Sequence, residues 1–202
     1  MAGDALTVGV LALQGDVREH VALLERLGAE VVRVRRPEEL ASVGGLVIPG
    51  GESTVIDKLS RQFGLREPIR EAIRDGMPML GTCAGLIMLA DSIEDAIPGQ
   101  QSFGGLDAVV RRNAFGRQTE SFEAELVVPE LGEEPVHAAF IRGPVVERVG
   151  PAARALASLP GGRVVAVEQG ALIGISFHPE ISGETRFHER FLAHVAARRV
   201  PA

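Results

Sequence analysis

Short apolar runs, separated by turns and helical patterns, dominate the first half of this 202-residue sequence. The runs predict buried strands at residues 6–13, 31–34, 45–49 and 78–82. Apolar residues spaced three and four apart predict amphipathic helices at 17–27 and through 86–90. Strands that are apolar throughout and alternate with such helices indicate a parallel sheet covered by helices.

The second half of the sequence is richer in strands than in helices. Short strand-like runs, separated by glycine and proline, occupy 107–110, 124–128, 136–141 and 163–167. They indicate a mixed or antiparallel extension of the sheet, which an apolar strand at 171–177 and a helix at 184–198 follow. Because no linker or repeat interrupts the pattern, we predict one α/β domain over 1–202, a three-layer sandwich around a mostly parallel sheet with that extension.

Composition limits the class of protein. Hydrophobic residues make up 46% and charged residues 24% of the chain, which is the mix of a globular rather than a disordered protein. The net charge of −6 argues against nucleic acid and anionic membranes as partners, since both require a basic surface. No apolar segment approaches a membrane span, the first residues lack a signal-peptide pattern, and one cysteine cannot form an intrachain disulfide. We therefore expect a cytoplasmic protein with no nucleic-acid or membrane partner.

The single cysteine, Cys83, lies where a strand is predicted to turn into a helix. Residues 81–85 read Gly-Thr-Cys-Ala-Gly, the Gly-x-nucleophile-x-Gly form of a nucleophile elbow. Such a turn carries the thiol to the carboxyl end of the sheet, where open α/β sheets bind ligands, and to a helix N-terminus, whose partial positive charge favours the thiolate. The alternative is a buried small hydrophobe, a frequent role of free cysteine, but the flanking glycines favour the nucleophile.

A thiolate nucleophile requires a base and a group that orients the base. His178 ends the apolar strand at 171–177, so we expect it at the same edge of the sheet as Cys83. Glu180 follows two residues later, and residues two apart in an extended chain point to the same side, so its carboxylate should reach one imidazole nitrogen. The alternative is a strand-end histidine beside a surface glutamate. The other histidines fit solvated helix faces or the start of a strand: His20, His188, His194 and His137.

Taken together, these motifs resemble the class I, triad-type glutamine amidotransferases. The resemblance is carried by residues 81–85, by His-Pro-Glu at 178–180 and by Pro-Gly-Gly-Glu-Ser-Thr at 49–54. It narrows to the glutaminase subunits of the deoxyxylulose-5-phosphate-independent pyridoxal 5′-phosphate synthases through the segments 12–20, 112–118, 121–123 and 140–142. The similarity runs from Val8 to Val195 and implies a class I glutamine amidotransferase fold of the flavodoxin-like kind.

This resemblance implies hydrolysis of the side-chain amide of L-glutamine to L-glutamate and ammonia. By the same analogy, Cys83 attacks the amide carbon to form a thioester, His178 transfers protons, and Glu180 holds the imidazole. The oxyanion of the intermediate needs backbone N–H donors, and the candidates are Ala84, directly after the nucleophile, and Gly51 in the Gly-Gly loop. An ordinary turn between a strand and a helix is the alternative for that loop.

The resemblance also implies a site for the rest of the L-glutamine molecule. An arginine fork suits the α-carboxylate of the substrate, and backbone groups suit its amino-acid end. The alternative for the arginines is a solvated surface charge, and Gln14 is expected either near the oxyanion loop or the partner, or as a turn residue. The substrate-binding residues implied are Gly51, Glu52, Ser53, Arg112, Ile141 and Arg142.

A protein partner is implied as well. Ammonia released into water is lost to its consumer, so a glutaminase of this kind docks to a (β/α)8-barrel subunit that builds pyridoxal 5′-phosphate. We expect docking to order the oxyanion loop and to raise turnover. The sequence holds no cluster of metal-ligand residues, no P-loop and no dinucleotide fingerprint, so we predict neither a metal nor a cofactor for this chain.

Three other functions fit part of the pattern. A glutaminase that feeds imidazole glycerol phosphate synthesis would share the triad but is not expected to carry 112–118 in this form. Single-cysteine, flavodoxin-like hydrolases and chaperones share an elbow cysteine but lack His-Pro-Glu at a strand end. An interaction module that has lost its chemistry has no need of an intact triad.

Overall fold

A computed structural model describes residues 5–112, 121–141 and 143–199. Its strands are β1 Thr7–Leu11, β2 Glu30–Val34, β3 Leu46–Ile48, β4 Met79–Thr82, β5 Ala90–Glu94, β6 Leu106–Arg111, β7 Phe122–Leu126, β8 Val136–Phe140, β9 Val145–Val149, β10 Arg154–Ser158, β11 Val164–Gln169 and β12 Leu172–Ile175. Its helices are α1 Val17–Arg26, α2 Pro37–Ala41, α3 Ser53–Gln62, α4 Arg66–Arg74, α5 Ala84–Leu89, the short 3-10 helix Pro129–Leu131, α6 Pro179–Ser182 and α7 Arg186–Arg199. None of these helices is long and apolar enough to cross a membrane.

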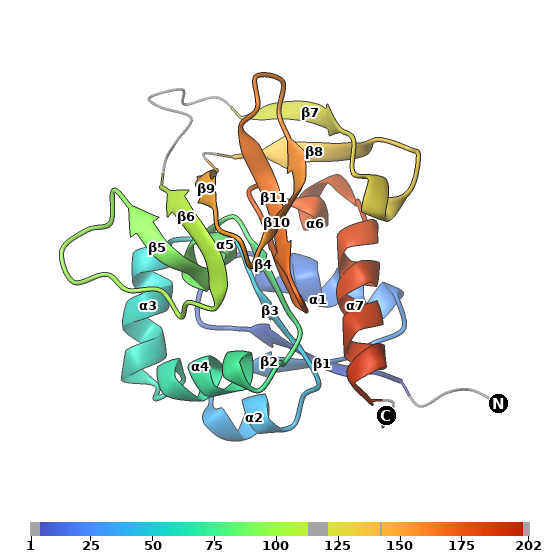
Figure 1. The fold of residues 1–202 in the computed structure, drawn as a ribbon. Coiled ribbons are helices and arrows are strands. Elements are labelled where there is room, and N and C mark those ends of the chain that lie inside the picture. Colours follow the sequence, from blue (N-terminus) through green and yellow to red (C-terminus); the bar gives the residue numbers. More distant parts are fainter. Residues whose placement is uncertain (1–4, 113–120, 142, 200–202) are drawn as a thin grey trace.

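One mixed sheet runs through both halves of the chain (Figure 1). Among the described residues it holds ten strands in the order β2-β1-β3-β4-β12-β11-β9-β6-β5, with β10 paired to β11. The pairs from β2 to β12 are parallel, and β11 then pairs antiparallel with both β12 and β9. The strands β7 and β8 form a separate antiparallel pair. The predicted α/β fold with a mostly parallel sheet and a mixed extension is confirmed.

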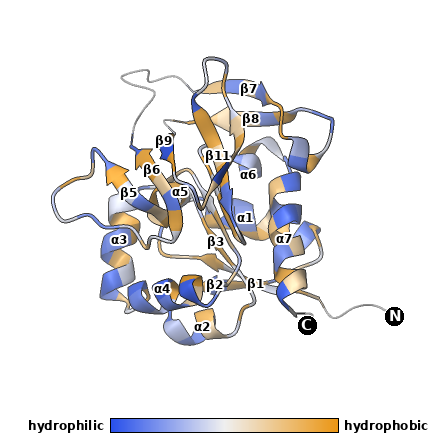
Figure 2. Cartoon of the chain, viewed as in Figure 1, coloured by the Kyte–Doolittle hydropathy of each residue, from blue (hydrophilic) through white to orange (hydrophobic). Residues whose placement is uncertain are grey.

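Helices cover both faces of the sheet, because successive strand residues point to opposite sides. In β3, Leu46 and Ile48 pack into the core under α2, α3, α4 and α5, whereas Val47 packs into the core under α1 and α7. The central strands are accordingly hydrophobic and the outer surfaces of the helices hydrophilic (Figure 2). The result is the predicted three layers.

Some elements were not predicted from the sequence. The stretch between β3 and β4 folds into α3 and α4, which consist mostly of polar or charged residues and bury few apolar residues, such as Ile56 and Ile69. The strands β5, β9 and β10 alternate irregularly between buried and exposed residues and were also missed. The helix predicted through 86–90 ends at Leu89, because Ala90 adopts an extended backbone and begins β5.

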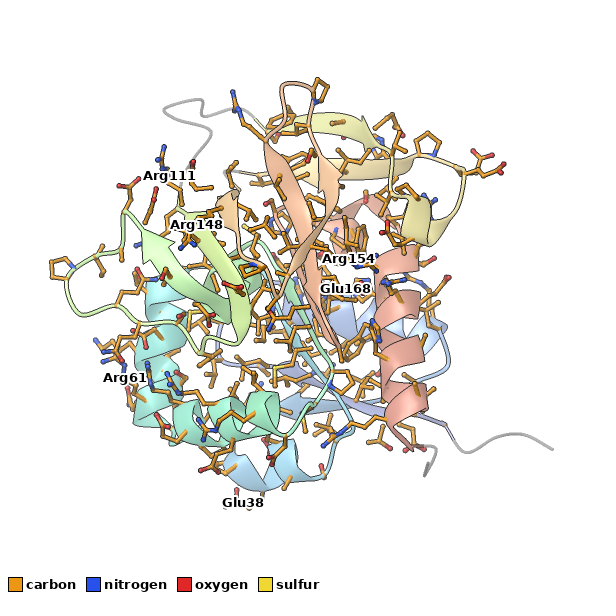
Figure 3. All side chains as sticks on the ribbon, viewed as in Figure 1. Glu38, Arg61, Arg111, Arg148, Arg154 and Glu168 are labelled. Carbon is orange, nitrogen blue, oxygen red and sulfur yellow. The ribbon has the colours of Figure 1, made fainter. Side chains whose placement is uncertain are left out.

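A buried carboxylate joins the sheet to the last helix. Glu168 of β11 is 4% exposed. It accepts hydrogen bonds from Arg154 of β10 (Nε, 3.1 Å), from Arg190 of α7 (Nε, 2.6 Å) and from His194 of α7 (Nε2, 3.1 Å). Glu168 and Arg154 lie between β11 and α7 in Figure 3. Burial by itself would raise the pKa of Glu168, but the two arginines and the histidine outweigh it and lower that pKa to about 2.

Replacing Glu168 by glutamine should therefore destabilise the fold at neutral pH. The variant leaves Arg190 without its carboxylate partner and leaves Arg154 with Glu130 alone. Because the carboxylate is buried but both arginines are partly exposed, the expected cost is about 1–3 kcal/mol. The pKa of Glu168 is lower in the folded protein than in the unfolded chain. Its contribution to the free energy of unfolding is therefore complete above the unfolded-state pKa near 4.5 and is lost as the pH falls toward 2. Urea unfolding at pH 7 and at pH 3.5 should show a gap between wild type and variant that narrows in acid. Glu71→Gln, on the exposed surface of α4, is the matched control. An equal loss of unfolding free energy in both variants would contradict the stabilising role of the buried Glu168 carboxylate.

Candidate active site

The nucleophile elbow is held in a strained backbone conformation. Cys83 follows β4 and precedes α5 with a positive φ of 50°, a conformation that costs a non-glycine residue about 1–3 kcal/mol. Two contacts fix it. The backbone N–H of Cys83 donates to the carbonyl of Ile175 at 2.8 Å, and Gly85 lies so close to β3 that a Cβ atom there would be 2.0 Å from the carbonyl oxygen of Ile48. The surrounding backbone therefore holds the turn, and the thiol is only 8% exposed.

The register of β4 and β12 brings His178 to this turn. The two strands pair in parallel with Ile175 opposite Thr82, so the residues that follow each strand emerge at the same edge of the sheet. The backbone N–H of His178 donates to the carbonyl of Ala139 in β8 at 3.0 Å, which fastens the β7–β8 pair to the histidine. Cys83 and His178, 95 positions apart in the sequence, consequently line one pocket.

Glu180 contacts His178 as expected, but for a different geometric reason. An extended chain was expected here, whereas Pro179 begins the short helix α6 and His178 precedes it. The Glu180 carboxylate still turns back, and its Oε1 lies 2.8 Å from Nδ1 of His178. Since a carboxylate only accepts, this contact assigns the proton to Nδ1 and leaves Nε2 as the nitrogen available to the thiol.

The electrostatics of the site favour a charged imidazole. Burial alone would lower the pKa of His178, but interactions with Asp16, Cys83 and Glu180 outweigh it and raise that pKa. Oδ2 of Asp16 lies 3.4 Å from Nδ1 of His178, so two carboxylates face the same nitrogen. Burial raises the pKa of Glu180, and the hydrogen bond from His178 opposes that rise. An imidazolium held beside a thiol stabilises the thiolate, the reactive form of cysteine.

The pocket around Cys83 has a volume of about 420 Å³. Three of the residues that the resemblance implied in binding, Gly51, Glu52 and Ile141, line it together with Cys83 and His178. The other lining residues are Gln14, Asp16 and Ile181. A pocket of this size has room for a free amino acid, and its walls offer both carboxylate and amide groups.

Gln14 holds the loop that carries Gly51. Its Oε1 accepts a hydrogen bond from the backbone N–H of Glu52 at 2.7 Å. Gly51 has a φ of +152°, and a Cβ atom there would lie 2.4 Å from the same Oε1, so the loop approaches Gln14 as closely as only glycine allows. Gln14 thus lies at the loop, one of the places expected for it.

The other residues predicted for the site are not among the described residues that line the pocket. Ala84 begins α5 directly after Cys83 and is buried. Arg112 is 11% exposed and is therefore not a solvated surface charge: Nη2 donates to Oε1 of Glu52 at 3.0 Å, so the arginine reaches the pocket wall through that glutamate. Ser53 is buried, is not among the pocket-lining residues, and accepts a hydrogen bond at Oγ from Nε2 of Gln100 at 2.9 Å. Arg142 and residues 113–118 lie outside the described part of the chain.

Gln100 was missed in the sequence analysis. Its Oε1 accepts from Nη1 of Arg112 at 2.7 Å, and its Nε2 donates to Oγ of Ser53 at 2.9 Å. One amide therefore joins two of the predicted binding residues. Gln100 lies in the loop between β5 and β6, which has no motif, so no signal in a single sequence could have pointed to it.

Two histidines occupy positions opposite to those expected. His20 and His188 were expected on solvated faces of helices, but both are fully buried, and Nδ1 of His20 lies 2.8 Å from Nε2 of His188. The expectation failed because each helix turns this side chain inward among apolar neighbours. His194 is partly exposed and contacts Glu168, and His137 is exposed and contacts Glu125 at 2.7 Å.

One group of possible metal ligands occurs among the described residues. Asp16, His178 and Glu180 place ligand atoms within 4.8 Å of one another. Nδ1 of His178 and Oε1 of Glu180 are already bonded to each other, so this geometry is that of a hydrogen-bonded pair beside a second carboxylate.

The sequence and the fold match known proteins along most of their length. A family model described as the SNO glutamine amidotransferase family matches residues 10–197. The chain belongs to this family. A pyridoxal 5′-phosphate synthase subunit PdxT from Clavibacter sepedonicus is 68% identical over 190 residues, covering 94% of this chain and 91% of the relative. A protein of the same name from Streptomyces avermitilis is 57% identical, with 96% of each chain covered.

Solved structures agree with this family. One titled as a glutamine amidotransferase superposes on 94% of this chain and 98% of its own with a TM-score of 0.87 and 47% sequence identity. The structure of PurLQS from Thermotoga maritima has a TM-score of 0.71 at 16% identity, covering 95% of this chain and 99% of that chain, and shows the shared fold.

The geometry of Cys83 and His178 predicts an unusual pH dependence of thiol alkylation. Because Cys83 is the single thiol of the chain, the rate of its reaction with iodoacetamide can be followed by mass spectrometry without interference. In the wild type the imidazolium of His178 faces the thiol in the same pocket, so alkylation at pH 6 should be faster than in a variant without that imidazole. In His178→Asn the rate at pH 6 should fall by about tenfold or more, toward that of an ordinary thiol.

The matched control is His137→Asn, which changes an exposed histidine on β8. It should alkylate like the wild type at every pH. A profile in the His178 variant that is identical to the wild type would contradict the predicted ion pair.

Proposed function

We propose that the chain is a glutaminase that hydrolyses L-glutamine to L-glutamate and ammonia through a triad of Cys83, His178 and Glu180. The observation that carries the proposal is the single pocket in which the thiol and imidazole meet, in a chain of a glutamine amidotransferase family. We further propose that the ammonia is delivered to the synthase subunit of a pyridoxal 5′-phosphate synthase, since the PdxT relatives are named as subunits of that enzyme.

The proposed reaction has two halves. The thiolate of Cys83 attacks the side-chain amide carbon of glutamine, and the electron pair of the carbonyl moves to its oxygen. When the C–N bond breaks, Nε2–H of His178 protonates the departing nitrogen, which leaves as ammonia, and a thioester remains. His178 then takes a proton from water as the water attacks the thioester, which releases glutamate and restores the thiolate.

Glu180 and Asp16 support the charged imidazole in both halves. Glu180 holds Nδ1–H at 2.8 Å and so keeps Nε2 directed to the reacting atoms. The oxyanion is proposed to accept from the backbone N–H groups of Ala84 and Gly51. The position of Ala84 after the nucleophile and the close packing of Gly51 against Gln14 support this assignment.

The substrate-binding residues proposed are those of the sequence analysis, together with a supporting amide. Glu52 and Ile141 line the pocket. A row of hydrogen bonds runs from Glu52 to Arg112, from Arg112 to Gln100 and from Gln100 to Ser53. We propose that this row sets the position of Glu52 toward the amino-acid end of glutamine. Arg142 remains part of the proposal on the resemblance alone.

We also propose that residues 1–202 act as one glutaminase domain and that the protein is cytoplasmic. The sheet that passes through both halves of the chain and the match of the family model over 10–197 support the first of these.

Cys83→Ala should abolish glutaminase activity and leave docking intact. Loss of a nucleophile that acts as part of a triad lowers kcat by at least about 10⁴-fold. Glutamate release should be measured with and without a pyridoxal 5′-phosphate synthase subunit, and binding of the variant to that subunit by calorimetry. Equal wild-type turnover in the presence and absence of the subunit would refute the partner-dependent activation, and activity in the Cys83 variant would refute the triad.

Gln100→Leu should raise KM for glutamine more than it lowers kcat. The variant removes the amide that joins Arg112 to Ser53, so Glu52 loses support that contributes equally to substrate and transition-state binding, and a tenfold rise in KM corresponds to about 1.4 kcal/mol. Gln101→Leu is the matched control, because only the backbone N–H of Gln101 makes a described hydrogen bond, to Asp57. A rise in KM shared by both variants would show that the loop, rather than the Gln100 amide, matters.

A further inference from the structure

A pair of buried histidines lies behind the proposed triad. His20 comes from α1 and His188 from α7, 168 positions apart, and neither is exposed to solvent. Nδ1 of His20 and Nε2 of His188 are 2.8 Å apart, and the ring centroids are 5.1 Å apart. Burial, and for His20 also the neighbouring histidines, lowers both pKa values, so both rings are neutral at physiological pH.

His20 contacts both the nucleophile turn and the carboxylate of the triad. Its Nε2 lies 3.1 Å from Oγ1 of Thr82, the residue directly before Cys83. The same nitrogen lies 3.6 Å from Oε2 of Glu180. Nε2 of His20 therefore faces both Thr82, which precedes the nucleophile Cys83, and Glu180, which is bonded to the base His178.

Oε2 of Glu180 has no hydrogen-bond partner in the part of the chain that the structure describes. Within the described residues no hydrogen bond reaches this fully buried oxygen, whereas Oε1 is bonded to His178. A buried carboxylate oxygen without a donor is costly, and the Nε2 atom of His20 is close enough to lower that cost through its N–H dipole.

The contacts select one tautomer for each ring. If His188 donates from Nε2 to Nδ1 of His20, then His20 carries its proton on Nε2 and directs it toward Thr82 and Glu180. Nδ1 of His188, which has no described partner, is then an unpaired acceptor. The opposite choice would leave an unpaired buried N–H at His188 and aim a lone pair of His20 at the carboxylate, so it is disfavoured.

We propose that His20 is a positioning residue of the triad. Fixed by His188 in the Nε2–H tautomer, it holds Oε2 of Glu180 so that Oε1 stays turned toward Nδ1 of His178. The inference rests on the proposed glutaminase function. His20 is not among the residues that line the pocket, so it acts through its contacts with Glu180 and Thr82.

The charged and titratable groups around this network come from several elements. His178 and Glu180 lie at the start of α6, and Asp16 precedes α1 and faces both. Arg26 at the end of α1 lowers the pKa of His188, and Glu184 before α7 raises that pKa. In a variant without the His20 donor, the pKa of Glu180 should rise further, because its carboxylate loses a favourable dipole.

Two variants of His20 test the proposal against simple core packing. In His20→Gln the amide nitrogen can take the place of Nε2, whereas in His20→Asn the shorter amide reaches only the place of Nδ1. Both are polar and both fill less space than histidine, so a purely structural role predicts similar losses. The measurements are kcat and KM for glutamine in the presence of the synthase subunit, the pH profile of kcat, and the pH profile of Cys83 alkylation.

We expect a difference between the two variants. Losing the outer partner of an orienting group costs about 10- to 100-fold in metal enzymes, and we expect at least about a tenfold loss of kcat in His20→Asn with KM nearly unchanged. In His20→Asn the acid limb of the pH profile of kcat should move to higher pH. The acid limb of the pH profile of Cys83 alkylation should move in the same direction. His20→Gln should stay within about threefold of wild type. His194→Gln, on the same helix as His188 but outside the network, is the control for both.

The other possible outcomes also decide whether His20 positions the triad or only packs in the core. Equal losses in the Asn and Gln variants, unshifted pH profiles, or unfolding of both variants in circular dichroism would assign the two histidines to core packing and overturn the proposal. A wild type without glutaminase activity would refute the proposed function, and the alkylation profiles would still decide whether His20 controls the Cys83–His178 pair.

Discussion

The register between β4 and β12 is the constraint on which the site depends. Four residue pairs, from Leu172 opposite Met79 to Ile175 opposite Thr82, align the two strands in parallel. A slip of one residue would turn every side chain of β12 to the other face and move His178 away from the nucleophile turn. The hydrogen bond from the Cys83 N–H to the Ile175 carbonyl continues the ladder into the turn itself, so the strand pairing also defines the strained backbone of the cysteine.

Much of this arrangement was predictable because it follows from local patterns. The apolar runs that became β4 and β12 have clear ends, and the glycines around Cys83 indicate a tight turn. Parallel strands then place Cys83 and His178 at one edge without further information. The contact between His178 and Glu180 was also expected, but the reason given was wrong, since Pro179 begins a helix where an extended chain was assumed.

The parts that were not predictable depend on tertiary packing. The helical spacing gave a signal that was not used: His20 lies three residues after Val17 and four before Leu24, on the apolar stripe of α1. His188 likewise lies three residues before Phe191 on α7. The spacing shows which way each ring points, but the partners that accept a buried imidazole appear only when the two helices and β4 meet. Gln100 belongs to a loop, and its role comes from partners 12 and 47 positions away. Polar contacts of this kind have no period in the sequence, unlike the apolar contacts of strands and helices.

The bond between the His178 N–H and the Ala139 carbonyl has a mechanical consequence. It fastens the β7–β8 pair, which lies apart from the main sheet, to the peptide group of the base (Figure 1). Ile141, directly after β8, lies 39% exposed at the rim of the pocket. Ala139 and Ile141 are two residues apart on the same backbone, so the packing of this pair fixes the peptide group of the base and one side of the pocket rim together, and any displacement of β8 would move both.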